Sequence, residues 1–337
     1  MEFEEKKLKE TLSRIQKKVE PTIKKILIEG VPPRFHKLFL YQLSTGGKRL
    51  RPALTIISCQ ALGGKLSDAL YPAAGLEILH NYTLIIDDII DQSTLRRGQL
   101  TVWAKYGSSI ADCVSINFAA SIFQTAQNKE IAEIYCQTIK KITQGQILDI
   151  LFERAGRERE AYVLKNRPKV ITRNDYKGMI SKKTALLFQA CCQIGATCAG
   201  ASKKQINALK TYGLNLGMAF QIKDDILDIF GEEEKFSKKG RDIKERKGGN
   251  IVLILAKEEL AVKERKQIHS LMAKQKITDN NIKRIVSLIE KTNARQRAFQ
   301  IGEGFIKKAK QALRGLRDSQ NKAVLNQIAD FVVSRKY

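Results

Sequence analysis

The sequence predicts an all-α fold, a single domain built as a bundle of long helices. Apolar residues recur at helical rather than alternating spacing, and only six prolines interrupt the 337 residues. With 43% hydrophobic residues the chain can bury a large core, and no Gly-, Pro- or Ser-rich stretch is long enough to be a linker. We therefore expect one domain over residues 1–337.

Three apolar segments are long enough for buried or half-buried helices: Pro72–Ile90, Thr184–Ala199 and Ile206–Phe230. None has the alternation and turn residues of a strand series. The short run Ile251–Ala256 fits either a helix or a strand, because it is too short for its period to decide. The highly charged stretch 152–174 predicts a surface excursion from the bundle.

The sequence also indicates a compartment. Residues 1–20 are charged and contain no apolar signal region, and no stretch is long enough to span a membrane. The six cysteines lack the paired spacing of a zinc site, so we expect reduced core residues. Together these features predict a cytoplasmic protein.

The net charge of +25 raises the question of nucleic-acid binding. The lysines are spread along the predicted helices without interleaved aromatic residues, and no nucleic-acid-binding motif is present. We therefore expect a solvated basic surface and no nucleic-acid partner. Attraction of anionic substrates or of lipid headgroups, and with it a peripheral membrane association, stays open.

Two aspartate clusters stand in apolar surroundings and dominate the chain. Both have the spacing i, i+1, i+4, which places three carboxylates on one stripe of a helix. Such a stripe is costly unless a cation neutralises it, and oxygen-only ligands favour Mg²⁺, which in proteins often binds substrate phosphates as well. One cluster alone could equally be a solvated helix end, but two in similar settings favour a metal-bound diphosphate. The clusters are Asp87, Asp88 and Asp91, and Asp224, Asp225 and Asp228.

Basic residues lie close to both clusters in the sequence. In Gly46–Pro52 two glycines precede three cations, which suits a compact anion, although a helix start with exposed charges is the alternative. Arg96 and Arg97 follow the first cluster closely enough to fold back over it. Lys183 and Thr184 open an apolar segment, where the amides of a helix start would favour an anion.

In their order along the chain, these motifs resemble the trans-isoprenyl diphosphate synthase family, the polyprenyl synthetases, which include geranylgeranyl and farnesyl diphosphate synthases. The resemblance covers most of the chain, and its combination of motifs is far more specific than any one of them. The matching segments are Gly46–Pro52, Glu77–Arg97, Gly145–Asp149, Lys183–Thr184 and Gly217–Asp228, followed by Lys238, Asp242 and Lys247.

The resemblance implies the isoprenoid synthase fold, with long antiparallel helices around a central apolar cavity, and a homodimer. It implies that Asp87, Asp91 and Asp224, supported by Asp88, Asp225 and Asp228, bind three Mg²⁺ that bridge an allylic diphosphate. In the family the two aspartate helices face each other at the cavity mouth. The same diphosphate would be held by Arg96, Lys183 with Thr184 beside it, Gln221, Lys238 and Lys247.

The second substrate implied by the resemblance is isopentenyl diphosphate. Its binding set here is Lys48, Arg51, His80 and Arg97, with Arg49 alongside. His80 has a second argument, because it lies two helical turns before Asp87 and therefore on nearly the same face.

The reaction implied is a Mg²⁺-dependent head-to-tail condensation. The allylic diphosphate leaves, the isopentenyl double bond attacks the allylic carbocation, and the released diphosphate takes up a proton, so no protein nucleophile is needed. Product length is set in the family four and five residues before the first aspartate, here at Thr83 and Tyr82. One aromatic residue predicts geranylgeranyl diphosphate (C20), with farnesyl diphosphate (C15) as the alternative. An ideal helical wheel turns Tyr82 away from the aspartates, so a core role stays open.

Some positions depart from the family pattern. Ile86 replaces a histidine of many relatives, and Asn117 stands near a usual Asp. Neither change removes a metal ligand. They keep open a non-catalytic regulatory subunit of a heteromeric synthase, although every motif aspartate is present. A class I terpene cyclase fits less well, because its second metal motif is absent.

Overall fold

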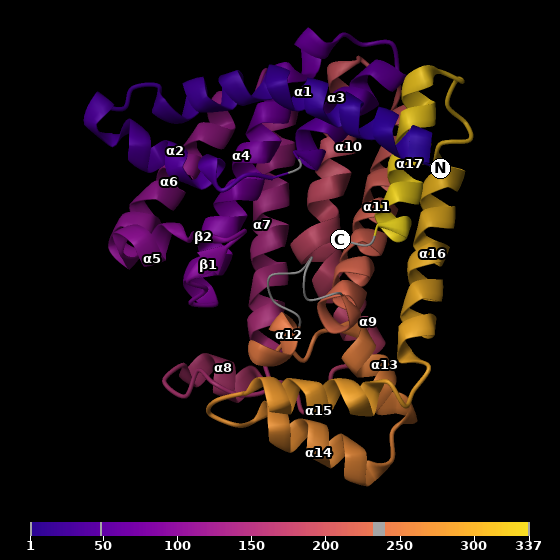
Figure 1. The fold of residues 1–337 in the computed structure, drawn as a ribbon. Helices are drawn as coiled ribbons and strands as arrows, with labels where there is room; N and C mark the ends of the chain where they lie inside the picture. The colour runs from indigo at the N-terminus through magenta and orange to yellow at the C-terminus, as the bar shows by residue number, and fades with distance from the viewer. Residues whose placement is uncertain (1, 48, 232–239, 336–337) are drawn as a thin grey trace. The chain divides into compact units, whose positions relative to one another are not determined.

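The computed structural model describes residues 2–47, 49–231 and 240–335 (Figure 1). The fold is all-α, as expected from the sequence. The structure also contains one antiparallel hairpin, formed by β1 (Leu95–Arg96) and β2 (Gln99–Leu100), outside the three segments that the sequence predicts to be helical. In these described ranges, no helix is long and apolar enough to cross a membrane.

The chain folds into two compact units. The first contains Met1–Ile139, Leu187–Gly213 and Lys310–Ala329, and the second contains Lys140–Leu186, Leu214–Ala309 and Asp330–Tyr337. The boundaries at residues 139/140 and 213/214 fall inside helices, in agreement with the absence of a linker from the sequence. A single domain over residues 1–337 stays a prediction.

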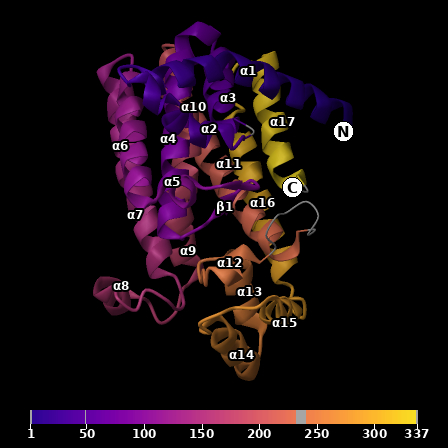
Figure 2. The same cartoon turned by 60° about the vertical axis from the view of Figure 1, so that its left-hand side comes forward.

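The first unit is built around α4, which packs against α1, α3 and α6 (Figure 2). Its elements are α1 (Glu2–Ile28), η1 (Pro33–Phe35), α2 (His36–Ser44), α3 (Leu50–Ala61), α4 (Leu66–Ile90), β1, β2, α5 (Val102–Tyr106) and α6 (Ser108–Gln124). Five further helices have residues mostly or partly in this unit: α7 (Lys129–Leu151), α10 (Leu186–Cys198), α11 (Lys203–Phe230), α16 (Ala294–Ala312) and α17 (Gln320–Ser334).

The second unit has its own apolar core, centred on α13. Its short elements are α8 (Ala161–Asn166), α9 (Arg173–Ile180), the π-helical turn η2 (Ser181–Ala185), α12 (Arg241–Lys244), α13 (Ile251–Glu259), α14 (Val262–Met272) and α15 (Asp279–Ile289). The ambiguous run Ile251–Ala256 is helical, and all six of its residues are buried. Asn250 is the N-cap of this helix, because its side-chain oxygen accepts hydrogen bonds from the amides of Val252 and Leu253. Helices α14 and α15 lie side by side (Figure 1).

Helix α4 begins earlier than the sequence predicts. Its start was expected at Pro72, but the helix runs through this proline from Leu66. The side chain of Asp68 accepts a hydrogen bond from the amide of Lys65, which satisfies a backbone donor at the true start. The predicted end at Ile90 is confirmed.

The six cysteines are all free thiols. Cys59, Cys191 and Cys192 are buried, as expected, whereas Cys113 is exposed on α6, so the expectation of core residues is wrong for this one. In the excursion 152–174, α8 carries exposed Tyr162 and Leu164.

Candidate active site

The first aspartate cluster lies at the C-terminal end of α4. Asp87 and Asp88 are in its last turn, and Asp91 is the C-cap, with its amide donating to the carbonyl of Asp87 at 2.8 Å. A helix C-terminus carries the negative end of the helix dipole, which disfavours carboxylates. An ordinary solvated helix-end aspartate would stand at the other end, so this placement favours a cation site.

The β1–β2 hairpin returns Arg96 to this helix end. Its turn residues Arg97 and Gly98 both have positive φ, 52° and 77°, as a type I′ hairpin turn requires. Arg96 then makes a two-pronged ion pair with Asp88, from Nε to Oδ2 and from Nη2 to Oδ1, each at 2.8 Å. Asp88 is buried, so this pair holds its carboxylate in one orientation.

Arg49 is a buried residue. It lies before α3 with a left-handed φ of 47°, and its guanidinium donates to Glu77 Oε1 at 2.9 Å and to the carbonyl of Leu43 at 3.0 Å. These contacts favour a structural role over direct contact with a substrate. The alternative of a helix start with exposed charges therefore fails at this residue.

His80 lies among arginines in the first unit. Burial lowers its pKa well below the usual range, and the nearby charges of Arg51, Arg97, Arg96 and Arg49 lower it further. The imidazole is therefore neutral at physiological pH and can donate one hydrogen bond.

The other predicted members of this set are held by close packing. Arg97 donates to the carbonyl of Gly46, and Arg51 lies over the ring of Phe188, 4.8 Å from its centre. Gly47 has a φ of 144°, a backbone conformation that residues with a side chain rarely adopt, so glycine is favoured beside Arg97. Lys48 lies outside the described residues.

In the second unit, one carboxylate holds two predicted substrate-binding lysines. Lys183 and Lys247 donate to the same oxygen of Asp149, at 2.8 and 2.9 Å, and Lys247 also reaches Glu153 at 3.4 Å. Burial would raise the pKa of Asp149, but the two lysines outweigh it and hold this pKa well below its usual range. The cluster holds the two ammonium groups close together.

Lys183 does not open a helix, and this prediction was wrong. It lies in the π-helical turn η2, inside a helical run that continues from α9 into α10. A Cβ on Gly145 would lie 2.3 Å from the amide nitrogen of Lys183, and one on Gly217 would lie 2.5 Å from the Cα of Ala185. The backbone of the π turn therefore packs directly against the backbones of α7 and α11. Single π-helical turns within α-helices are frequent at functional sites.

A hydrogen-bond chain leads from the same turn to the second aspartate cluster. Thr184 Oγ1 donates to Gln221 Oε1 at 2.8 Å, and Gln221 Nε2 donates to Asp225 Oδ1 at 2.9 Å. The other oxygen of Asp225 accepts the amide of Ile251 at 3.0 Å. Two residues predicted for diphosphate binding therefore fix the orientation of a predicted metal ligand.

The second aspartate cluster lies in the last two turns of α11, again at a helix C-terminus. Asp228 accepts the amides of Arg241 and Asp242 at 3.0 and 3.1 Å. Burial raises the pKa of Asp225 and of Asp228 well above the usual range, and the charge of Asp242 raises both further. Lys238 lies outside the described residues.

Arg335 is a residue of the candidate site that could not be identified from the sequence. Its Nη2 donates to Asp224 Oδ1 at 2.6 Å and to the carbonyl of Phe220 at 3.0 Å, and its guanidinium lies 4.0 Å from the centre of the Phe220 ring. A lone arginine near the chain end has no motif around it. Only the fold reveals that it pairs with a predicted metal ligand.

The donor chemistry of both clusters fits Mg²⁺. Each offers carboxylate oxygens alone, at the helix end where negative charge is least favourable, and Asp225 and Asp228 repel Asp242. Among residues 2–47, 49–231 and 240–335, no three acidic, His or Cys side chains form a ready-made metal site. Arg96 pairs with Asp88, and Arg335 pairs with Asp224.

The predicted chain-length residues lie on α4, before the first cluster. Tyr82 and Thr83 are both half-buried, and Thr83 Oγ1 donates to the carbonyl of His80 at 2.8 Å. Thr83 is therefore tied to its own helix.

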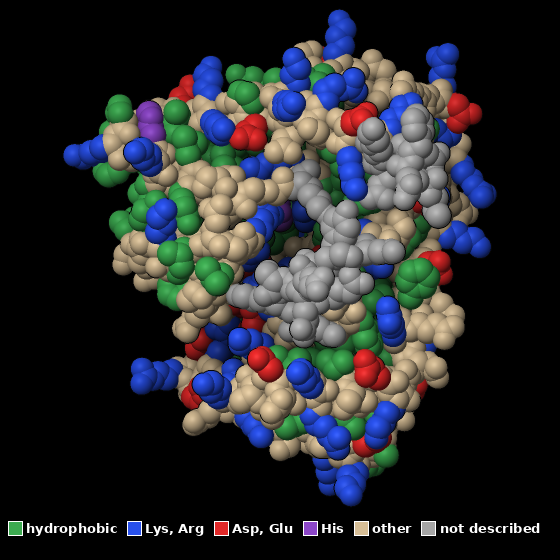
Figure 3. Space-filling view, viewed as in Figure 1, with side chains coloured by type: hydrophobic (Ala, Val, Ile, Leu, Met, Phe, Trp, Pro, Cys, Tyr) green, Lys and Arg blue, Asp and Glu red, His purple; other side chains and the backbone are tan. Residues whose placement is uncertain are grey.

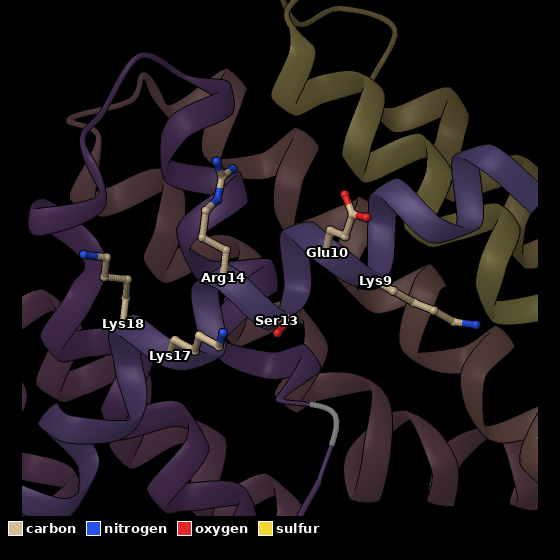
Figure 4. A pocket seen from close by; sticks show the side chains of 6 residues that line it. All are labelled: Lys9, Glu10, Ser13, Arg14, Lys17 and Lys18. Atoms are coloured by element: carbon tan, nitrogen blue, oxygen red, sulfur yellow. The ribbon is translucent and has the colours of Figure 1, made fainter.

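The surface charge is dispersed. Figure 3 shows Lys and Arg side chains scattered over the visible face, with acidic side chains between them. One shallow hollow is lined by α1 alone, through Lys9, Glu10, Ser13, Arg14, Lys17 and Lys18, whose side chains point in different directions (Figure 4). The absence of a nucleic-acid partner stays a prediction.

An all-α fold with two carboxylate-rich helix ends, each beside basic side chains, defines a protein of the isoprenoid synthase class. The model of the polyprenyl synthetase family matches residues 32–289. The chain is 31% identical over 328 residues to a geranylgeranyl diphosphate synthase of Methanosarcina mazei, covering 95% of each protein.

Solved structures have the same fold. A decaprenyl diphosphate synthase from Rhodobacter capsulatus matches with a TM-score of 0.87 and 28% identity, over 98% of this chain and 99% of that one. A geranylgeranyl pyrophosphate synthetase from Pyrococcus horikoshii matches with a TM-score of 0.84 and 30% identity, over 98% and 99%. The chain belongs to the polyprenyl synthetase family, and the predicted isoprenoid synthase fold is confirmed.

Proposed function

We propose that the protein is a Mg²⁺-dependent trans-prenyltransferase that condenses isopentenyl diphosphate head-to-tail with an allylic diphosphate and releases geranylgeranyl diphosphate. The observation that carries the proposal is the pair of aspartate clusters, each at a helix C-terminus and each beside basic side chains. Membership of the polyprenyl synthetase family and relatives named geranylgeranyl diphosphate synthases support it.

The allylic diphosphate is assigned to the aspartates and to the basic residues near them. Asp87, Asp91 and Asp224, with the other three aspartates in support, would hold Mg²⁺, which would supply positive charge to stabilise the departing diphosphate. We assign three ions to this site, by analogy with the family. Arg96, Lys183 and Lys247 bind the diphosphate oxygens, and Asp149 keeps the two lysines together before substrate arrives.

Isopentenyl diphosphate is assigned to Arg51, Arg97 and His80, with Lys48 as a further member. The charges of Arg51 and Arg97 lie close enough to His80 to lower its pKa, and the resulting positive potential favours a diphosphate. Neutral His80 contributes a hydrogen bond rather than a charge.

The chemistry uses no protein nucleophile. Burial raises the pKa of the Cys59 and Cys192 thiols to about 12, so neither is a thiolate at neutral pH. Proton removal from the condensed cation is assigned to the released diphosphate. The protein's own contribution is positioning and electrostatic stabilisation.

The test is an incubation of the purified protein with Mg²⁺, isopentenyl diphosphate and dimethylallyl, geranyl or farnesyl diphosphate, followed by sizing of the dephosphorylated products. The expected result is a C20 alcohol that disappears when Mg²⁺ is chelated. A C15 product would replace the C20 assignment with farnesyl diphosphate synthesis. Failure to elongate any primer would overturn the enzyme assignment in favour of a regulatory subunit.

Replacing Tyr82 by Ala is expected to lengthen the products beyond C20. Removal of one ring opens the space into which a growing prenyl chain extends, provided that this residue lies at the cavity floor. Tyr162→Ala, at an exposed tyrosine of α8, is the matched control and should leave the product length unchanged. An unchanged product length in Tyr82→Ala would show that Tyr82 is only a packing residue.

We also propose a homodimer, supported by an apolar stripe on α6. Cys113, Ile116, Ala120 and Phe123 are exposed on one face of this helix, and Ile116 is 67% exposed. Such a continuous stripe is typical of an interface.

The substitution Ile116→Glu is expected to convert the dimer to a monomer, because it places a charge in the apolar interface. Light scattering after size-exclusion chromatography measures this directly. Val262→Glu, at an exposed valine of α14, is the matched control and should leave the mass unchanged. If Ile116→Glu keeps the wild-type mass, α6 is not the interface. Cytoplasmic location and membrane association stay predictions.

A further inference from the structure

A cavity of about 600 Å³ lies in the second unit and shares no lining residue with the proposed active site. Its lining comes from Arg154 and residues 169–174 of the charged stretch 152–174, from α13 and α14, and from Gly248. None of the family motifs that the sequence analysis singled out explains it.

The lining of this cavity is strongly basic. Arg154, Lys169, Arg173, Lys257 and Arg265 all contribute, and His269 stands at the edge formed by α14. Glu258, the acidic residue of this lining, is already paired with two arginines. Its carboxylate accepts hydrogen bonds from Nε and Nη2 of Arg173, at 2.6 and 2.7 Å, and from Nη2 of Arg297 at 2.8 Å. Among the described lining residues, the positive charge is therefore in large excess.

Two of these cations are half-buried. Arg154 donates through Nη1 to the carbonyls of Pro168 and Lys169, both at 3.2 Å, while its Nε is buried without a hydrogen-bond partner in the described part of the chain. Burial, and then the charge of Arg154, lowers the pKa of Lys257 to about 8. Two half-buried cations side by side are unfavourable unless an anion joins them.

Three apolar side chains also line the cavity, beside the polar Thr172 and Asn174. Ile171 and Ile254 form buried wall, and Val170 is 72% exposed at the cavity. The volume exceeds that of an inorganic anion, so the carbon part of a phosphorylated molecule has room beside the cations.

We propose that this cavity is a second anion site, which binds the phosphoryl group of a small phosphorylated ligand between Arg154, Lys257 and Arg265. Its cations supply charge-assisted hydrogen bonds to phosphoryl oxygens, and Ile171 and Ile254 contact the carbon part. The inference does not depend on the proposed catalytic function, because it rests on the second unit's own cavity.

The test uses pyridoxal 5′-phosphate, which carries a phosphate beside an aldehyde. Its aldehyde condenses with a lysine amine to an imine and water, and added borohydride reduces the imine to a stable adduct that peptide mapping locates. We expect Lys257 to be labelled at least about tenfold faster than by pyridoxal, which lacks the phosphate, and inorganic diphosphate in chelator to suppress that labelling. Lys266, exposed on α14 outside the cavity, is the control and should show neither effect.

Two ligand sources are separated by comparing protectors. Protection by geranyl diphosphate at clearly lower concentration than by inorganic diphosphate identifies a prenyl-type ligand, and equal protection identifies a polar phosphate; either supports an anion site. Arg154→Gln should weaken the protection about tenfold. Equal labelling of Lys257 by both aldehydes, or no protection by either anion, overturns the proposal, since the low pKa of Lys257 would then explain its reactivity alone.

Discussion

Replacing Asp149 by Asn is expected to lower the free energy of unfolding by about 3 kcal/mol and to reduce turnover by about a hundredfold. Lys183 and Lys247 donate to the same oxygen of this carboxylate, and Lys247 is only 8% exposed. Asparagine leaves two cations close together without a full countercharge. The partial exposure of Lys183, 22%, keeps the loss at the lower end of what a broken buried pair costs.

A double variant separates stability from catalysis. Asp149→Asn combined with Lys247→Met removes one charge of each sign, so most of the lost stability should return while turnover stays low. Glu264→Gln, which breaks the exposed pair with Lys291, is the matched control and should change stability little. If Asp149→Asn is no more harmful than this control, the Asp149 cluster does not hold the two lysines in place.

The pH dependence of the Asp149 effect follows from the sign of its shift. The pKa of Asp149 is lowered in the folded protein, so its contribution to stability is present above the unfolded pKa of about 3.9 and is lost as pH falls through the folded value. Chemical unfolding should therefore give the same difference between wild type and Asp149→Asn throughout the neutral range. A difference that already narrows near neutral pH would contradict the lowered pKa.

Local sequence signals predicted the helix ends that carry the aspartates, because apolar periodicity and the i, i+1, i+4 spacing are local features. They failed where structure depends on distant contacts. The apolar segment predicted to be helical begins at Pro72, yet the helix begins at Leu66, where Asp68 accepts a hydrogen bond from the amide of Lys65. The π turn at Lys183 is set by its close approach to Gly145, far away in the chain.

The candidate site was predictable to the extent that its residues belong to motifs. Asp149 was found as part of a motif, but its contact with two lysines needs three distant segments to meet. Arg335 has no motif, and only the fold reveals its pair with Asp224. For Ile251–Ala256, the preceding Asn250 was a usable signal, since asparagine is a strong helix N-cap.

Replacing Asp242 by Asn is expected to stabilise the metal-free protein and to lower its Mg²⁺-dependent turnover. In chelator the protein should gain about 1 kcal/mol of unfolding free energy at neutral pH, because one charge is removed from a group of three carboxylates. Mg²⁺-dependent turnover should fall by about a hundredfold, since the same crowding prepares Asp225 and Asp228 for a cation. Asparagine keeps the oxygen that accepts the hydrogen bond from Asn250 at 2.7 Å.

The sign of the pH dependence makes this expectation testable. Burial, followed by the charge of Asp242, raises the folded pKa of Asp225 and Asp228, so their contribution to stability is present below the unfolded pKa and is lost as pH rises through the folded value. In chelator, unfolding curves should show wild type losing more stability than Asp242→Asn between about pH 4 and neutrality.

Added Mg²⁺ should stabilise wild type more than the variant, because a cation binds the ionised carboxylates of the folded state. Asp318→Asn, at an exposed carboxylate paired with Lys322, is the control without such a gain. If wild type and Asp242→Asn lose the same unfolding free energy as pH rises, the three carboxylates do not repel one another. The electrostatic argument for a metal ion at the second aspartate cluster would then fail.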